Sequence, residues 1–241
     1  MLSILAIDTA SSVSSVAVAR AGKLAAEVSV EAGHTHSETL LSHIEGALAF
    51  AGVEKAALAG VAVSIGPGSF TGLRIGLAMA KAIAYGLGIP LVGVSTLAAL
   101  ALAFPLAGIY TLALMDAQKG NAYAGLYEWQ DGALHEVQPV HVAPLAEAIE
   151  EAASLGRPVL LVGELAQKKR ARLENLPANV TLAPAHLAAA RASHVAQLGL
   201  SRLAAGESDD VMALEPFYIR RSEAEVLWEK RQAAKKAGAP C

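Results

Sequence analysis

The chain has 241 residues, of which 54% are hydrophobic and 17% are charged. Disordered chains have the opposite balance, so this composition predicts one large domain or two small ones with packed cores. The formal net charge of −3 argues against a protein that binds nucleic acid alone through a broad basic face.

The hydropathy pattern does not predict a membrane protein. The apolar run over residues 94–106 is shorter than the roughly 18 residues of a spanning helix and contains Pro105. Residues 1–4 place no basic stretch before an apolar one, so no secretory signal is expected. The one cysteine, Cys241, excludes an internal disulfide. Together these features favour the cytoplasm.

The first part of the sequence predicts a meander of three strands, followed by alternating helices and strands. The strands are expected over residues 2–8, 14–19 and 24–30, with a tight turn at 21–23. The elements expected next are a helix from Ser37, its N-cap, to Ala49, a buried strand over 61–65, a long helix from Phe70 to Leu87 and a strand over 91–94.

The second part repeats this order. The apolar strand that ends in Asp116 mirrors the strand that ends in Asp8, and an alternating stretch and a turn follow each of them. We interpret this as a diverged duplication that gives two similar α/β lobes, residues 1–105 and 106–215. The alternative is that any two α/β halves look alike. An alanine-rich helix is expected over 185–205, and the tail, residues 216–235, is expected to pack back on the first lobe.

The end of the first strand is a candidate phosphate site. Hydroxyl and backbone N–H groups in the turn at Asp8, Thr9, Ser11 and Ser12 can hold phosphate, and aspartate can hold Mg²⁺ through water. The alternative is an ordinary Asx or Ser turn.

A glycine-rich loop at residues 66–72 is the second candidate. Gly66 and Gly68 allow close backbone approach, and the loop, with Ser69 and Thr71, opens a helix whose N-terminus favours anions. It lacks the Lys-Ser/Thr pair of a P-loop. The alternative is a sharp strand-to-helix turn with Ser69 as the N-cap.

Other catalytic patterns are missing from the sequence. His34, His36 and His43 have no carboxylate or cysteine that completes a ligand set, so we expect no metal site and interpret them as surface or cap residues. No nucleophile–base pair stands out.

The long helix is apolar nearly all round. Its polar side chains, Arg74 and Lys81, lie on one narrow stripe, and small residues recur every fourth position from Gly72 to Ala84. Such a helix must be covered on more than one side, which predicts a subunit interface. The alternative is complete burial within the monomer. The residues expected at this interface are Leu40, Leu41, Ile44, Leu48, Leu73, Arg74, Gly76, Leu77, Ala80, Lys81 and Ala84.

Several motifs together resemble the bacterial TsaB family, also called YeaZ. The most specific is the string Gly-Pro-Gly-Ser-Phe-Thr-Gly-Leu-Arg-Ile-Gly at residues 66–76. The others are Ile-Asp-Thr-Ala at 7–10, Gly-His-Thr-His-Ser-Glu at 33–38, Gly-Val-Ser-Thr-Leu at 93–97, Met-Asp-Ala at 115–117 and Pro-Phe-Tyr-Ile-Arg at 216–220. They run almost from end to end of the chain.

The resemblance implies two RNase H-like lobes of the actin/Hsp70/sugar-kinase type. It also implies a role in forming N6-threonylcarbamoyladenosine (t6A) at position 37 of tRNAs that read ANN codons. The implied partners are the catalytic subunit TsaD and the ATPase TsaE, with tRNA bound through the complex. The predicted interface would also support a homodimer when the partner is missing.

Two departures bear on activity. Where the catalytic relative has a histidine-bearing metal motif, residues 93–100 have neither histidine nor carboxylate, which indicates a non-catalytic subunit that requires no cofactor. Gln118 stands where the family has arginine, which leaves the role of this turn open. The alternatives are an independent ATPase or M22-type peptidase, ATP or ADP bound without turnover at the shared interface, and direct tRNA binding by the basic tail.

Overall fold

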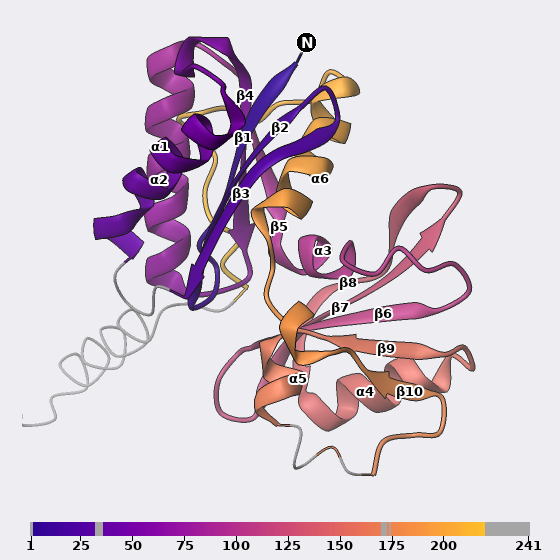
Figure 1. The fold of residues 1–241 in the computed structure, drawn as a ribbon. Helices are drawn as coiled ribbons and strands as arrows, with labels where there is room; N and C mark the ends of the chain where they lie inside the picture. The colour runs from indigo at the N-terminus through magenta and orange to yellow at the C-terminus, as the bar shows by residue number, and fades with distance from the viewer. Residues whose placement is uncertain (1, 32–35, 170–172, 174, 220–241) are drawn as a thin grey trace, which may run out of the picture.

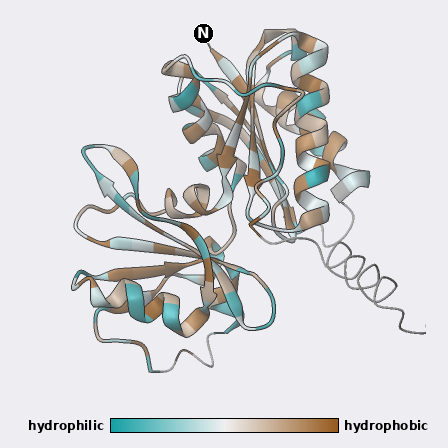
Figure 2. Ribbon diagram, turned by 180° about the vertical axis from the view of Figure 1, so that it is seen from behind, coloured by the Kyte–Doolittle hydropathy of each residue, from teal (hydrophilic) through white to brown (hydrophobic). Residues whose placement is uncertain are grey.

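The structure is a computed structural model, which describes residues 2–31, 36–169, 173 and 175–219. It has two lobes, each built on one five-stranded sheet (Figure 1). Hydrophobic residues dominate the central strands of both sheets (Figure 2). Within these residues, no helix has the length and apolar character needed to cross a bilayer.

The first lobe has the strand order β3-β2-β1-β4-β5. The three antiparallel strands of the meander are β1 (Ser3–Asp8), β2 (Val13–Arg20) and β3 (Lys23–Glu31), and β4 (Leu58–Gly66) and β5 (Leu91–Ser95) continue the sheet parallel to β1. Helices α1 (His36–Ala51) and α2 (Phe70–Leu87) cover one face (Figure 1), and a short 3-10 turn at Lys55–Ala57 precedes β4.

The second lobe repeats this plan with the order β8-β7-β6-β9-β10. Its strands are β6 (Tyr110–Asp116), β7 (Asn121–Gln130), β8 (Ala133–Pro144), β9 (Val159–Val162) and β10 (Val180–Leu182). Helices α4 (Leu145–Ser154) and α5 (Glu164–Lys168) follow the positions of α1 and α2 in the chain. The equal strand orders confirm the predicted α/β fold of two duplicated RNase H-like lobes of the actin/Hsp70/sugar-kinase type.

Two further helices contribute to the core between the lobes. α3 (Thr96–Ala101) follows β5, and α6 (Ala192–Ala204) packs on the face of the first sheet opposite α1 and α2 (Figure 1). One hydrophobic cluster contains Ile4 of β1, Val195 of α6 and Tyr127 of β7, so the lobes share a core. The predicted change of lobe near residue 105 coincides with the change of sheet. The predicted limit at residue 215 does not match the packing, because α6 lies on the first lobe.

Side chains from the first lobe cap the N-terminus of α6. The backbone N–H of Ala192 donates to Ser15 Oγ over 2.9 Å, and that of Ser193 donates to Glu27 Oε1 over 2.9 Å. The helix expected over 185–205 begins later than predicted, at Ala192. Before it lie a 3-10 turn at Ala185–Leu187 and Arg191, whose backbone is extended. α1 begins at His36, which makes Ser37 a residue of its first turn rather than its N-cap.

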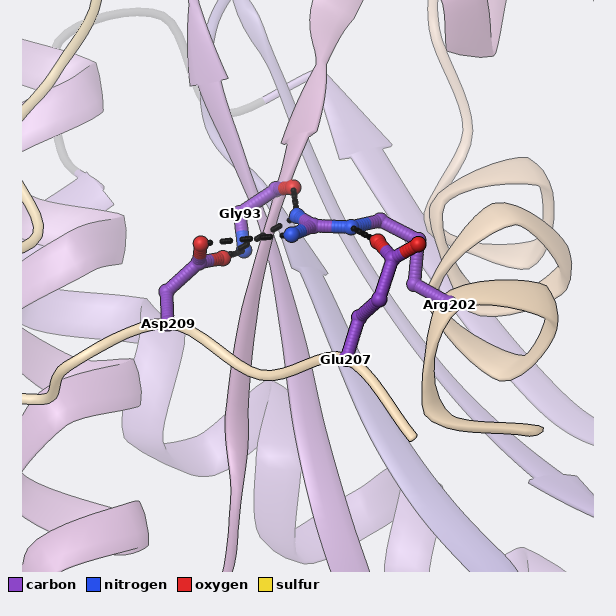
Figure 3. Close-up of polar contacts among 4 residues, drawn as sticks. All are labelled: Gly93, Arg202, Glu207 and Asp209. Atoms are coloured by element: carbon purple, nitrogen blue, oxygen red, sulfur yellow. Dashed lines mark hydrogen bonds and ion pairs between the residues drawn. The ribbon is translucent and has the colours of Figure 1, made fainter. Parts of the chain in front are cut away.

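Residues 207–219, here called the strap, run from α6 around the edge of the first sheet to α2. The Arg202 guanidinium at the end of α6 donates hydrogen bonds to both carboxylate oxygens of Asp209 (Figure 3). Arg202 also donates to the backbone carbonyl of Gly93 on β5, and the backbone N–H of Gly93 donates to the Asp209 carboxylate. Farther along, the N–H of Phe217 donates to the carbonyl of Ile65 over 2.7 Å. Residues 216–219 therefore pack on the first lobe, as predicted, whereas 220–235 lie outside the described residues.

Candidate functional site

Most residues predicted for the interface are buried inside the first lobe. Leu40, Ile44 and Leu48 of α1 and Leu73 and Leu77 of α2 are each at most 5% exposed, and all lie on the sides of the helices that face the lobe. They contribute to the core of this chain and cannot contact a partner while it is folded. The prediction was wrong for these five residues because a pattern of apolar positions does not distinguish a core from an interface.

The row of small residues on α2 also faces inward. A side chain added at Gly72 or Gly76 would collide with Thr9, and Ala80 and Ala84 are buried. The small residues thus allow α2 to approach the turn after β1, and their assignment to a partner helix was wrong. Close packing was predicted correctly, but against the wrong neighbour.

The outward sides of α1 and α2 form a different surface, here called the docking face. Leu41 is 49% exposed and Arg74 is exposed, while Lys81 is half-buried; these three belong to the predicted set. Sequence reasoning missed Phe50, Ala78, Ala82 and Tyr85, although the last three follow Arg74 at the spacing of one helical stripe. The docking face is the set of exposed or half-buried residues Leu41, Arg74, Ala78, Lys81, Ala82 and Tyr85 together with Phe50, with Phe50 79% and Tyr85 75% exposed. Leu41 and Phe50 are nine positions apart and therefore lie on opposite flanks of α1.

The strap holds both cations of the docking face. Arg74 Nε donates a hydrogen bond of 2.8 Å to the Tyr218 hydroxyl, and the guanidinium carbon lies 3.8 Å from the centre of the Phe70 ring. The Phe70 and Tyr218 rings are 5.1 Å apart. Lys81 Nζ donates to the backbone carbonyl of Met212 over 3.0 Å. The strap therefore borders the docking face along α2.

Asp8 ends β1 and is fully buried. Its Oδ1 accepts the N–H of Ala10 over 3.3 Å, as in an Asx turn. Burial raises the pKa of Asp8 to about 6, against smaller lowering effects of the Ser64 hydroxyl and the Ala10 N–H. A carboxyl group in this environment is protonated more easily than an exposed one.

The two candidate phosphate loops contact each other. The Thr9 hydroxyl donates to the carbonyl of Gly72 over 2.7 Å, and the N–H of Ser69 donates to the carbonyl of Ala10 over 2.7 Å. Gly68 is needed because a side chain there would collide with Ala10. In this conformation the contact between the loops uses two groups predicted to hold phosphate.

The remaining groups of the two loops have local roles or face outward. Ser69 Oγ accepts the N–H of Gly72 and caps α2, and Ser11 Oγ accepts the N–H of Val13. Ser12 is half-buried, and Thr71 is exposed. These contacts match the ordinary turns weighed as alternatives for both loops, and nucleotide binding stays a prediction.

The place of the relative's metal motif is an apolar helix. In α3 Leu97, Ala99 and Leu100 are at most 2% exposed and belong to the core shared by the lobes. Within the described part of the chain, no group of three or more His, Cys, Asp or Glu side chains can hold a metal ion. His43 Nδ1 instead lies 3.1 Å from Ser14 Oγ. In the second lobe, Asp116 Oδ1 accepts the N–H of Gln118 in the turn that mirrors the Asp8 turn.

Comparison with known proteins gives consistent matches over most of the chain. Residues 28–228 match the family model described as TsaD: tRNA N6-adenosine threonylcarbamoyltransferase. The tRNA threonylcarbamoyladenosine biosynthesis protein TsaB of Bacillus subtilis (strain 168) is 32% identical over 232 residues, which cover 96% of this chain and 100% of that protein. The protein of the same name in Escherichia coli (strain K12) is 30% identical over 150 residues, covering 61% of this chain and 64% of that protein.

A solved structure shows the same fold. YeaZ from Pseudomonas aeruginosa superimposes with a TM-score of 0.75 at 26% identity, covering 90% of this chain and 100% of that one. The match includes both lobes, so the relative and this chain share the two-lobed fold.

Proposed function

Because the chain belongs to the TsaB family, whose members have a role in t6A modification of tRNA, we propose that it is a non-catalytic subunit of the complex that forms t6A at position 37 of tRNAs reading ANN codons. In this proposal it binds and activates the catalytic subunit TsaD, together with TsaE. tRNA is bound through the assembled complex.

The docking face is the observation that carries this proposal. Leu41, Phe50 and Tyr85 leave large apolar areas in water on two adjacent helices. Burying such a side chain contributes about 1.5–3 kcal/mol, and Ala78 and Ala82 between them allow another helix to approach closely. The same face supports a homodimer when TsaD is missing, because a surface of this kind can pair with itself.

The composition of α3 supports a role without catalysis. A transferase that works through a metal ion needs several ligands near the end of β5, whereas this chain has buried Leu97 and Leu100 there. The Asp8 carboxylate accepts the backbone N–H of Ala10, which is the contact of an ordinary Asx turn. We therefore favour the subunit over an independent ATPase or an M22-type peptidase.

Binding to purified TsaD of the same organism tests the proposal. Leu41→Glu places a charge on the docking face and is expected to raise the dissociation constant by about 100-fold, or about 2.7 kcal/mol. Leu155→Glu is the matched control, since Leu155 is 43% exposed and lies in the second lobe. Equal affinity of wild type and Leu41→Glu would exclude the docking face.

ATP or ADP at the interface shared with TsaD is part of the proposal. The more accessible groups of the two loops, Ser12 and Thr71, would line it, and the chain alone is expected to bind nucleotide weakly because loop contacts engage Thr9 and Ser69. Calorimetric titration of nucleotide into the chain, into TsaD and into their mixture distinguishes a site shared by the two proteins from a site on either protein alone. Tight binding by the chain alone would contradict a shared site.

A further inference from the structure

The most specific arrangement that the proposed function does not use is the contact between the strap and Arg74. Tyr218 follows Arg74 by 144 positions, yet its hydroxyl accepts the Arg74 Nε–H over 2.8 Å. The guanidinium lies 3.8 Å from the Phe70 ring centre and 5.7 Å from that of Tyr218. Two rings and one hydrogen bond thus fix a side chain that is normally flexible.

These contacts leave the outer end of the guanidinium available. The hydrogen bond uses Nε, and the close ring contact is with Phe70, so among the described residues these contacts leave the N–H donors of both Nη groups unused. In the described ranges Arg74 forms no ion pair, although Arg157 and Arg202 each pair with a carboxylate. A guanidinium held in one orientation with free Nη groups is well suited to bind a carboxylate with two parallel hydrogen bonds.

The Arg74 guanidinium lies over Phe70 at the N-terminal end of the exposed stripe of α2. Arg74 is exposed and lies on the same stripe of α2 as Ala78, Ala82 and Tyr85. Ala78, one turn away, is too small to block access to the guanidinium. An approaching helix would therefore meet a fixed cation beside an apolar surface.

We propose that Tyr218 is a positioning residue, which with Phe70 presents the Arg74 guanidinium on the docking face for an acidic side chain of TsaD. This inference rests on the proposed function and adds the chemistry of the contact. Holding Arg74 in place removes the entropy that a free arginine loses on binding, so the strap raises affinity without touching the partner. It also gives the strap a function beyond covering the sheet edge.

The test is a double-mutant cycle on binding to purified TsaD. Arg74→Gln is expected to weaken binding about tenfold, which corresponds to about 1.4 kcal/mol, and to reduce its dependence on salt. Arg74→Lys is expected to weaken it by a similar factor, because an ammonium cannot form the two parallel bonds. Tyr218→Phe keeps the ring and removes the hydrogen bond, so it is expected to raise the dissociation constant for TsaD about threefold.

The cycle separates positioning from general stability. In the Arg74→Gln background, Tyr218→Phe is expected to have no further effect, whereas a role in folding would lower affinity in both backgrounds. Additive effects of the two substitutions would overturn the inference, as would unchanged binding and salt dependence of Arg74→Gln. Thermal unfolding of each variant, expected to match wild type within a few degrees, verifies that the folded protein is compared.

Two controls identify what binds Arg74. If Leu41→Glu abolishes binding and Arg74→Gln does not alter it, the inference fails and the proposed function stands. If neither substitution alters the affinity for TsaD, the docking face is excluded and the inference fails with it. If the wild-type chain does not bind TsaD at all, the proposed function fails. A chain that ends at residue 219 tests whether the chain's own tail pairs with Arg74. Loss of the Arg74→Gln effect in that chain would overturn the assignment to TsaD, and an unchanged effect supports it.

Discussion

The Thr9 hydroxyl donates a hydrogen bond of 2.7 Å to the carbonyl of Gly72, and this contact joins the turn after β1 to the first turn of α2. Both groups are buried, so neither has water as an alternative partner. The contact fixes the rotation of α2 on its sheet, and this rotation determines which side of α2 faces outward. The docking face thus depends on a contact in the interior.

Gly72→Ala is expected to destabilise the protein. The added methyl group would collide with the backbone carbonyl of Thr9, which cannot move without shifting β1, and overpacking of this kind costs about 1–3 kcal/mol. Urea unfolding measures the loss. Gly86→Ala is the matched control in the same helix, where a methyl group meets no atom within 4 Å, and it should stabilise by about 0.5–1 kcal/mol. A stable Gly72→Ala variant would contradict the tight contact.

Asp8 makes stability depend on pH. Its folded pKa is about 6 against a usual 3.8, so between these values the folded state binds more protons than the unfolded state. The free energy of unfolding should therefore fall as pH rises from about 4 to about 6, by an amount on the order of 3 kcal/mol. Asp8→Asn should remove this decrease. Urea unfolding at a series of pH values checks the prediction, and a variant with the same pH profile as wild type would contradict it.

The strap can be loosened at its first anchor. Asp209→Asn weakens the pairing with Arg202 at the Gly93 backbone (Figure 3), so a loss of about 1–3 kcal/mol and faster hydrogen exchange at Gly93 are expected. Glu128→Gln breaks the more exposed pair with Arg157 and should cost less than about 1 kcal/mol. Equal losses of stability in the two variants would show that the Asp209–Arg202 pair contributes no more than an ordinary surface ion pair.

The sequence predicted the elements of the first lobe well. Alternating residues identified the meander, and α2 spans Phe70–Leu87 as expected because local signals mark both ends. Ser69 caps the N-terminus, and Gly88 adopts the left-handed conformation at the C-terminus. The duplication was also visible, since both lobes place an aspartate at the end of the central strand.

Which side of α2 faces inward could not be predicted. The helix is apolar nearly all round, so hydrophobicity does not fix its rotation, and a row of small residues fits a partner helix as well as the turn at Thr9. The position of α6 depends on Ser15 and Glu27, which lie far from Ala192 in sequence. The Tyr218–Arg74 contact is likewise too distant for local patterns to indicate. The three-dimensional fold is needed to see that these residues are neighbours.

Reconstitution of t6A formation tests the central claim most directly. The chain is mixed with TsaD, TsaE, tRNA and a source of threonylcarbamoyl-adenylate, and t6A is measured by mass spectrometry of the nucleosides with each protein omitted in turn. We predict that t6A forms only when both this chain and TsaD are present, and that Leu41→Glu reduces it to the level seen without this chain. Formation of t6A by this chain without TsaD, or undiminished formation without this chain, would contradict the account.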